Sequence, residues 1–224
     1  MMEQKFYKKY KLTSLKFWQN FWEYYKLHTI AIIFVLVFLT VGIRSCVTRV
    51  DVDLKIFYVG EYLIPLPEKL ETILSETVSD VDGDGRVTID ISNDAFSNGK
   101  DIEAAVAIFN RIDAELMSGN PFILMTDEKY IGRFEHNSAL SPIEDIIEGK
   151  NIPEENIKRD PKTGAAIAVD VASMPIGKEV GSLTGKKMYV GVKVLPKDKM
   201  NNEKYVKLYE ETINAVEKML EYKK

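Results

Sequence analysis

The sharpest cluster of chemical groups in the sequence is the run Asp80-Val-Asp82-Gly-Asp84-Gly85-Arg86. Three carboxylates stand at alternate positions, and a glycine follows the third, where the chain must turn tightly. Calcium prefers oxygen ligands of this kind, and the backbone carbonyl of Arg86 would add another. The sequence therefore predicts a candidate calcium site, with calcium as the one cofactor suggested and with these ligands: Asp80, Asp82, Asp84 and Arg86.

The residues that follow this run separate it from an EF-hand. An EF-hand needs a bidentate glutamate at position 12 of its loop, where this chain has Ile91, and a helix should follow where a strand is expected. A site made by the loop alone would bind calcium weakly, in the range of extracellular modules. The alternative is an Asp-Gly turn that joins a helix to a strand without metal.

Three other short motifs follow the order of the penicillin-binding signatures, namely Ser97-Asn-Gly-Lys100, Ser118-Gly-Asn120 and Lys162-Thr-Gly164. The nucleophilic serine of such enzymes begins a buried helix, whereas Ser97 falls in a polar loop ahead of Asp101. Beyond residue 47 the chain has one histidine, His136, and it carries no P-loop, dinucleotide-binding or G-x-S-x-G motif. We therefore assign no catalytic residue and expect a protein that is not an enzyme.

The elements that must position these groups follow from the spacing of apolar residues. Alternation predicts strands over 50–59 and 87–91, and a continuous apolar run predicts a buried strand over 122–126. Helices are expected over 65–78 and 101–118, opened by prolines and by Asp101. Further elements are predicted as follows: a short helix near 128–134, a capping box at Ser141–Glu144, strands over 165–172 and 187–195 joined by a Gly-rich connection, and a helix over 202–224.

This order of elements predicts an α/β fold: one three-layer domain with a mostly parallel sheet and helices on both faces. Open sheets of this class bind ligands beyond the carboxyl ends of their strands. The residues at those ends are the predicted ligand-binding positions: Gly60, Glu61, Tyr62, Ser92, Asn93, Thr126 and Asp127. The alternative is that they form ordinary loops and helix caps.

An uncharged apolar run, Thr29–Ile43, precedes this domain. Extended to residues 27–47 it has 21 residues, roughly 30 Å as a helix, which is enough to cross the hydrocarbon core of a bilayer. The predicted organisation is a basic aromatic leader over 1–26, a transmembrane helix over 27–47 and an α/β domain over 50–224. A cleaved signal peptide is the rival interpretation.

The charges on either side of the run predict the orientation. Residues 1–28 carry six lysines against Glu3 and Glu23, a net charge of +4, so the remainder of the chain carries −8. Cytoplasmic flanks collect lysine and arginine, which predicts a single-pass protein of the cell membrane with the leader in the cytoplasm and the domain outside. The acidic domain also argues against nucleic-acid binding.

Two features flank the predicted span. Aromatic residues recur at helical spacing in the leader, among them Trp18, Trp22 and Tyr25, which predicts an interfacial helix or a docking surface for another membrane protein. Cys46 is the one cysteine, so no internal disulfide forms. The sequence Ile43-Arg44-Ser45-Cys46 loosely matches a lipobox, which leaves lipidation of Cys46 or a free thiol as alternatives.

Three segments carry a resemblance to a known family: the strand at 53–58 with its following helix, Glu115-Leu-Met-Ser-Gly-Asn-Pro-Phe-Ile-Leu-Met125, and Leu140-Ser-Pro-Ile-Glu-Asp-Ile146. They resemble the first lobe of bacterial extracellular solute-binding proteins, the type II periplasmic-binding fold. The leader and span also resemble small single-pass proteins of Gram-positive bacteria. The resemblance covers residues 52–147, about one of the two lobes with which such proteins enclose a solute, and it implies solute binding on one side only.

We therefore expect a membrane-anchored, extracytoplasmic binding or interaction domain without catalytic activity. Its expected partners are membrane lipid and either another membrane protein or a small solute, with no nucleic acid. One alternative is a hydrolase that acts on envelope carbohydrate or peptide through Asp and Glu side chains, which a cleft holding two carboxylates roughly 5–10 Å apart would favour. Another alternative is a structural subunit of a membrane complex.

Overall fold

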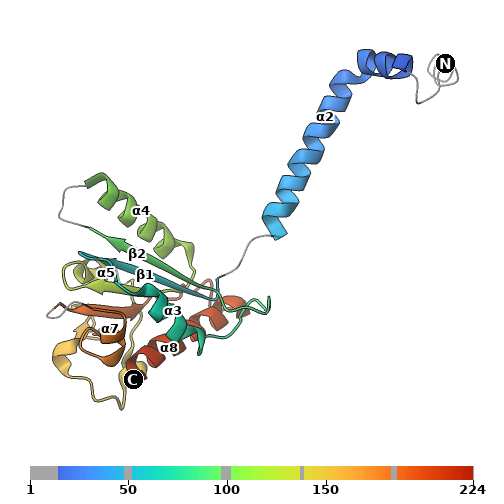
Figure 1. The fold of residues 1–224 in the computed structure, drawn as a ribbon. Coiled ribbons are helices and arrows are strands. Elements are labelled where there is room, and N and C mark those ends of the chain that lie inside the picture. Colours follow the sequence, from blue (N-terminus) through green and yellow to red (C-terminus); the bar gives the residue numbers. More distant parts are fainter. Residues whose placement is uncertain (1–14, 48–51, 97–101, 137–138, 183–185, 224) are drawn as a thin grey trace. The chain divides into compact units, whose positions relative to one another are not determined.

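A computed structural model describes residues 15–47, 52–96, 102–136, 139–182 and 186–223 of the chain. The chain divides into two compact units, Met1–Val50 and Asp51–Lys224, and each is described by itself. Figure 1 traces both units and labels their elements.

In the first unit the described residues form a long helix, α2, at Leu15–Val47. Its 33 residues extend over about 50 Å, so the helix is longer than a bilayer core and includes the aromatic part of the leader. The stretch Phe21–Thr40 is long and apolar enough to cross a membrane, although a signal sequence meets the same criteria. The side chain of Cys46, on which the lipidation hypothesis depends, lies outside the described residues.

The second unit is an α/β domain built on a six-stranded mixed sheet with strand order β2-β1-β3-β6-β5-β4. The strands are β1 at Leu54–Gly60, β2 at Ile89–Ala95, β3 at Ile123–Asp127, β4 at Ile157–Arg159, β5 at Ala166–Asp170 and β6 at Met188–Val192. β1 pairs in parallel with β2 and β3, as predicted, whereas the β3–β6, β6–β5 and β5–β4 pairings are antiparallel. The parallel pairing therefore belongs to the first half of the domain alone.

Seven helical segments accompany the sheet among the described residues: α3 at Pro67–Ser75, α4 at Ile102–Ser118, α5 at Ile131–His136, α6 at Glu144–Ile147, the 3-10 turn η2 at Glu154–Asn156, α7 at Pro175–Glu179 and α8 at Glu203–Glu221. Proline stands at the first turn of α3 and of α7. An N–H at this position has no partner within the helix, so its absence in proline costs no helical hydrogen bond. At the start of α8 the Asn202 side chain accepts a hydrogen bond from the Lys204 N–H.

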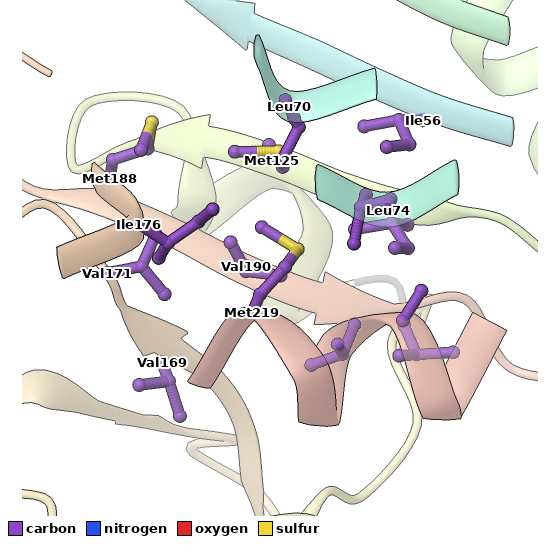
Figure 2. Packing of buried hydrophobic residues seen from close by; sticks show 14 of the residues in the cluster. Ile56, Leu70, Leu74, Met125, Val169, Val171, Ile176, Met188, Val190 and Met219 are labelled. Atoms are coloured by element: carbon purple, nitrogen blue, oxygen red, sulfur yellow. The ribbon is translucent and has the colours of Figure 1, made fainter. Parts of the chain in front are cut away.

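Alternate residues of β1 point into two separate buried clusters. Ile56 and Tyr58 belong to the cluster that α3, α6, α7 and α8 share, whereas Phe57 and Val59 belong to the cluster that α4 and α5 share. Figure 2 shows Leu70, Leu74 and Met219 in the first cluster. Each fully buried leucine of this kind contributes roughly 1.5–3 kcal/mol to stability.

Two element predictions are wrong in an instructive way. β2 begins at Ile89 and runs on to Ala95, so Ser92 and Asn93 lie inside a strand rather than beyond its end. The capping box at Ser141–Glu144 does not form, because α6 begins after Ile143 without a side-chain cap. The Glu144 carboxylate instead accepts from the Ala166 N–H at 2.7 Å.

Candidate functional site

The carboxyl ends of β1 and β3 lie side by side. At this point the connections between strands change from one face of the sheet to the other. β1 lies between β2 and β3, and the chain reaches these two neighbours in turn. The connection from β1 to β2 contains α3, and the connection from β2 to β3 contains α4, which packs in the other buried cluster. Such a switch point is the general position at which open α/β sheets bind ligands.

A pocket with a volume of about 40 Å³ lies at this switch point. Its walls come from Tyr58, residues 61–65 after β1, Asp127 at the end of β3, Ser182, residues 186–187, and Met188 at the start of β6. Drug-sized ligands occupy pockets of about 300–1,000 Å³, whereas one water needs about 10–15 Å³. The pocket therefore has room for a few water-sized groups and is too small to enclose a sugar ring or a peptide.

Asp127 fixes the loops around the pocket through its carboxylate. One oxygen accepts from the Glu61 N–H at 2.6 Å, and the other accepts from the N–H groups of Lys129 at 3.1 Å and Tyr130 at 3.3 Å. Asp127 therefore ties the loop after β1 to the loop after β3. Its negative charge remains at the wall of the pocket.

Glu61 is held between two lysines at the mouth of the pocket. Its Oε1 lies 3.1 Å from Lys129 Nζ, and its Oε2 lies 3.3 Å from Lys186 Nζ. The hydrogen bonds from Lys129 and then from Lys186 lower the pKa of the Glu61 carboxyl below its ordinary value. Glu61 is therefore an ionised hydrogen-bond acceptor at neutral pH.

Tyr58 forms the inner wall of the pocket and is only 7% exposed. Its hydroxyl has no hydrogen-bond partner among the described residues. Burial, followed by the charges of Asp127 and Glu61, raises the pKa of Tyr58 to about 12. The ring also lies against Gly60, where a Cβ atom would overlap the hydroxyl, so the small residue at the end of β1 is what admits Tyr58 into this position.

The other predicted ligand positions have different roles. Asn93 holds the loop after β1, since its side chain accepts from the Ile64 N–H and donates to the Ile64 carbonyl, both at 2.9 Å. Thr126 is buried and donates its hydroxyl to the Val59 carbonyl at 2.8 Å. Ser92 lies in β2 opposite Phe57. Of the seven predicted positions, those that line the pocket are Glu61, Tyr62 and Asp127.

Sequence reasoning missed two of the residues that shape the site, Tyr58 and Lys186. Tyr58 reads as an ordinary strand residue, because the alternating pattern says only which face it occupies. Lys186 is 125 positions away from Glu61 in the chain. It reaches the site because β6 runs antiparallel to β3, which pairs Met188 with Asp127 and brings the start of β6 to the switch point.

The acidic loop at 80–86 lies elsewhere, where the chain enters β1 and β2. Carboxylate oxygens of Asp53, Asp80 and Asp82 lie within 4.8 Å of one another. Asp84 is outside this cluster, and its carboxylate accepts from the Arg86 N–H at 2.8 Å. The structure therefore joins two of the predicted calcium ligands to Asp53, which sequence reasoning did not select.

Hydrogen bonds within the loop hold its carboxylates in place. Asp53 is 2% exposed and accepts from the N–H groups of Val81 at 2.7 Å and Thr88 at 2.8 Å. Asp80 accepts from the N–H groups of Gly83 at 2.6 Å and Gly85 at 2.7 Å. These contacts organise the loop without a cation, while its oxygen atoms remain of the type that calcium prefers.

The electrostatics of the loop reflect crowded negative charge. The hydrogen bond from the Gly85 N–H is the largest of the effects that lower the pKa of Asp80. The hydrogen bond from the Asp84 N–H is the largest single effect on Asp82, and it lowers the pKa. Burial, the hydrogen bond with Asp80 and the neighbouring negative charges together outweigh it, so the pKa of Asp82 is raised. A cation at this position would relieve that repulsion.

The remaining chemical motifs gain no support from their surroundings. Ser97–Lys100 and the His136 side chain lie outside the described residues. Lys162 and Thr163 lie in a turn in which the Asp160 carboxylate accepts from both of their N–H groups, rather than in the strand that a K-T-G motif requires. The chain matches no protein-family model and no curated protein.

Proposed function

We propose that this chain is a membrane-anchored, non-catalytic binding domain whose ligand site is the pocket at the carboxyl ends of β1 and β3. The observation that carries the proposal is the meeting of Glu61, Tyr62 and Asp127 around one pocket at the switch point. The size of the pocket favours recognition of one small polar group over enclosure of a whole solute. The likeness to one lobe of a solute-binding protein is part of this proposal and rests on sequence segments alone.

The state of the two carboxylates argues for binding rather than hydrolysis. A hydrolase that uses two acidic residues needs one of them protonated near neutral pH, which requires a raised pKa. The pKa of Glu61 is lowered by its two lysines, and Asp127 accepts three backbone hydrogen bonds. Glu61 is therefore suited to holding a ligand and is not suited to donating a proton.

The orientation is also part of the proposal. Six lysines precede the apolar part of α2, which favours an N-terminus in the cytoplasm and a domain outside the cell. The aromatic residues of α2 form a ladder along one face, with ring centroids 5.9 Å apart for Trp18–Phe21 and 5.4 Å apart for Phe21–Tyr25. We infer that this ladder lies in the headgroup layer, where amphipathic rings are favoured, and that the sheet with its two sets of helices forms a three-layer domain.

Two experiments test the proposal. Protease added to intact cells should remove the domain beyond residue 50, whereas a domain protected until lysis would refute the orientation. In lipid nanodiscs, the full chain should gain thermal stability from at least one class among amino acids, amines, carboxylic acids and sugars. Glu61→Gln should remove that gain. The matched control Glu203→Gln should keep it, because Glu203 also pairs with a lysine but lies on α8 away from the pocket.

A gain that is equal in both variants, or no gain from any class, would refute the site.

A further inference from the structure

The Tyr58 hydroxyl is a polar group of the pocket that no other pocket residue bonds to. Tyr58 is 7% exposed and lines the pocket, yet its hydroxyl has no hydrogen-bond partner among the described residues. The hydroxyl is not among the fully buried unpaired side-chain atoms, so it faces the open pocket and can bond to a group that enters it. A group that enters the pocket and bonds to this hydroxyl would therefore complete the site.

The charges around the hydroxyl decide which group fits. The carboxylates of Glu61 and Asp127 both line the pocket beside Tyr58. Lys186 and Lys187 also line the pocket, and when Lys186 leaves Glu61 the two carboxylates favour another cation that can donate hydrogen bonds in its place. We propose that the pocket binds a primary ammonium group, which donates to the Tyr58 hydroxyl and to Glu61, and that Lys186 occupies the mouth as an internal competitor.

This inference rests on the proposed function and names the chemistry of its ligand. The size of the pocket agrees with it, because an ammonium head occupies about the volume of one water and the cavity of about 40 Å³ holds a few. A carboxylate has three heavy atoms and would need more room.

Lys186 already shows the kind of contact that a ligand would make. Its Nζ lies 3.3 Å from Glu61 Oε2 and 6.0 Å from the ring centroid of Tyr62, which is an ammonium between a carboxylate and an aromatic face. The Lys186 side chain is 57% exposed, so it can leave without opening the fold. Lys129 stays on the other oxygen of Glu61, and a ligand therefore exchanges with Lys186 alone.

Removing the competitor is the direct test. The full chain in lipid nanodiscs is titrated with n-butylammonium chloride, with n-butanol and sodium pentanoate as uncharged and anionic counterparts at equal ionic strength, and the melting temperature is followed. We expect butylammonium alone to stabilise the chain. Lys186→Met should tighten the apparent affinity for butylammonium about two- to fivefold. This factor corresponds to the loss of an exposed ion pair worth about 0.5–1 kcal/mol, which the ligand must otherwise break.

Two further variants complete the test. Lys207→Met should leave the amine affinity unchanged, because Lys207 has the same 57% exposure and a glutamate partner at 3.2 Å but lies on α8. Tyr58→Phe should weaken amine binding while it keeps the ring in place. Two more probes, free lysine and N-acetyl-lysine amide, distinguish the sources of the ammonium group. Tighter binding of free lysine indicates a free amine. Tighter binding of N-acetyl-lysine amide indicates a lysine side chain of a protein.

The outcomes separate this inference from the proposed function. Stabilisation by pentanoate but not by butylammonium, or an amine affinity that Lys186→Met and Tyr58→Phe leave unchanged, would overturn the ammonium assignment while a binding pocket remained. No response to any probe in any variant would overturn both.

Discussion

The buried amine of Lys193 predicts how the stability of the domain depends on pH. Lys193 is 2% exposed, and its Nζ donates to the Glu115 carbonyl at 2.9 Å and to the Asn120 carbonyl at 3.0 Å, at the end of α4. Burial lowers the pKa of Lys193 from 10.5 to about 8, against a smaller raising effect of Glu115. The neutral amine keeps enough N–H groups for both carbonyls.

The direction of the effect follows from where the proton is held. Below pH 8 the lysine is charged in both the folded and the unfolded chain, so the free energy of unfolding carries the full penalty of burying the charge. Between about pH 8 and 10.5 the unfolded chain keeps the proton and the folded chain releases it, so stability rises with pH. A shift of this size corresponds to about 3 kcal/mol at most.

The assay is urea unfolding of the full chain in mild detergent at several pH values from 7 to 10.5, followed by far-UV circular dichroism. Lys193→Met should remove the alkaline rise, so the difference between parent and variant should change by about 1–3 kcal/mol across this window. Lys207→Met, an exposed lysine on α8, should leave the rise intact. Parallel pH curves for the parent and Lys193→Met would refute the reasoning.

Three further predictions follow from the packing and from the acidic loop. Calcium should raise the melting temperature of the full chain, and Asp82→Asn should remove that response while Asp84→Asn keeps it, because the Asp84 carboxylate lies outside the cluster of Asp53, Asp80 and Asp82. Gly60→Ala should destabilise the domain by about 1–3 kcal/mol in urea unfolding, since its methyl group overlaps the Tyr58 hydroxyl, and adding Tyr58→Phe should recover part of the loss. Leu74→Ala should cost about 2–5 kcal/mol in the same assay, whereas Met117→Ala, at a side chain 87% exposed, should change stability by less than about 0.5 kcal/mol.

The elements that the sequence predicted well are those whose apolar pattern is strong and long. β1, α4 and α8 lie close to their predicted positions, because alternation or helical spacing there extends over several turns or pleats, and β3 does so because its apolar run is continuous. β4 has three residues, of which two are the charged Lys158 and Arg159, and it left no pattern to detect. α7 was hidden because its segment holds Pro175 and Gly177, which read as a connection.

The candidate site was predictable only in part, for a different reason. Topology alone led to Glu61, Tyr62 and Asp127, since strand ends in a parallel sheet meet at one edge. The extension of β2 through Ser92 and Asn93 was not foreseen, because polar side chains on an edge strand resemble a loop. Contacts between distant segments, such as Asp53 with Asp80 or Lys186 with Glu61, depend on register and leave no local signal.

The antiparallel direction of β6 explains why this pocket contains lysine. A parallel strand beside β3 would present its carboxyl end at the switch point. β6 instead presents its start there, with Met188 opposite Asp127, so Lys186 and Lys187 line the pocket. The Leu66 N–H donates to the Val180 carbonyl at 3.2 Å, and Lys186 pairs with Glu61, so Val180 and Lys186 both contact the chain that follows β1. The departure from a parallel sheet therefore brings Lys186 to the pocket, where the proposed ligand would displace it.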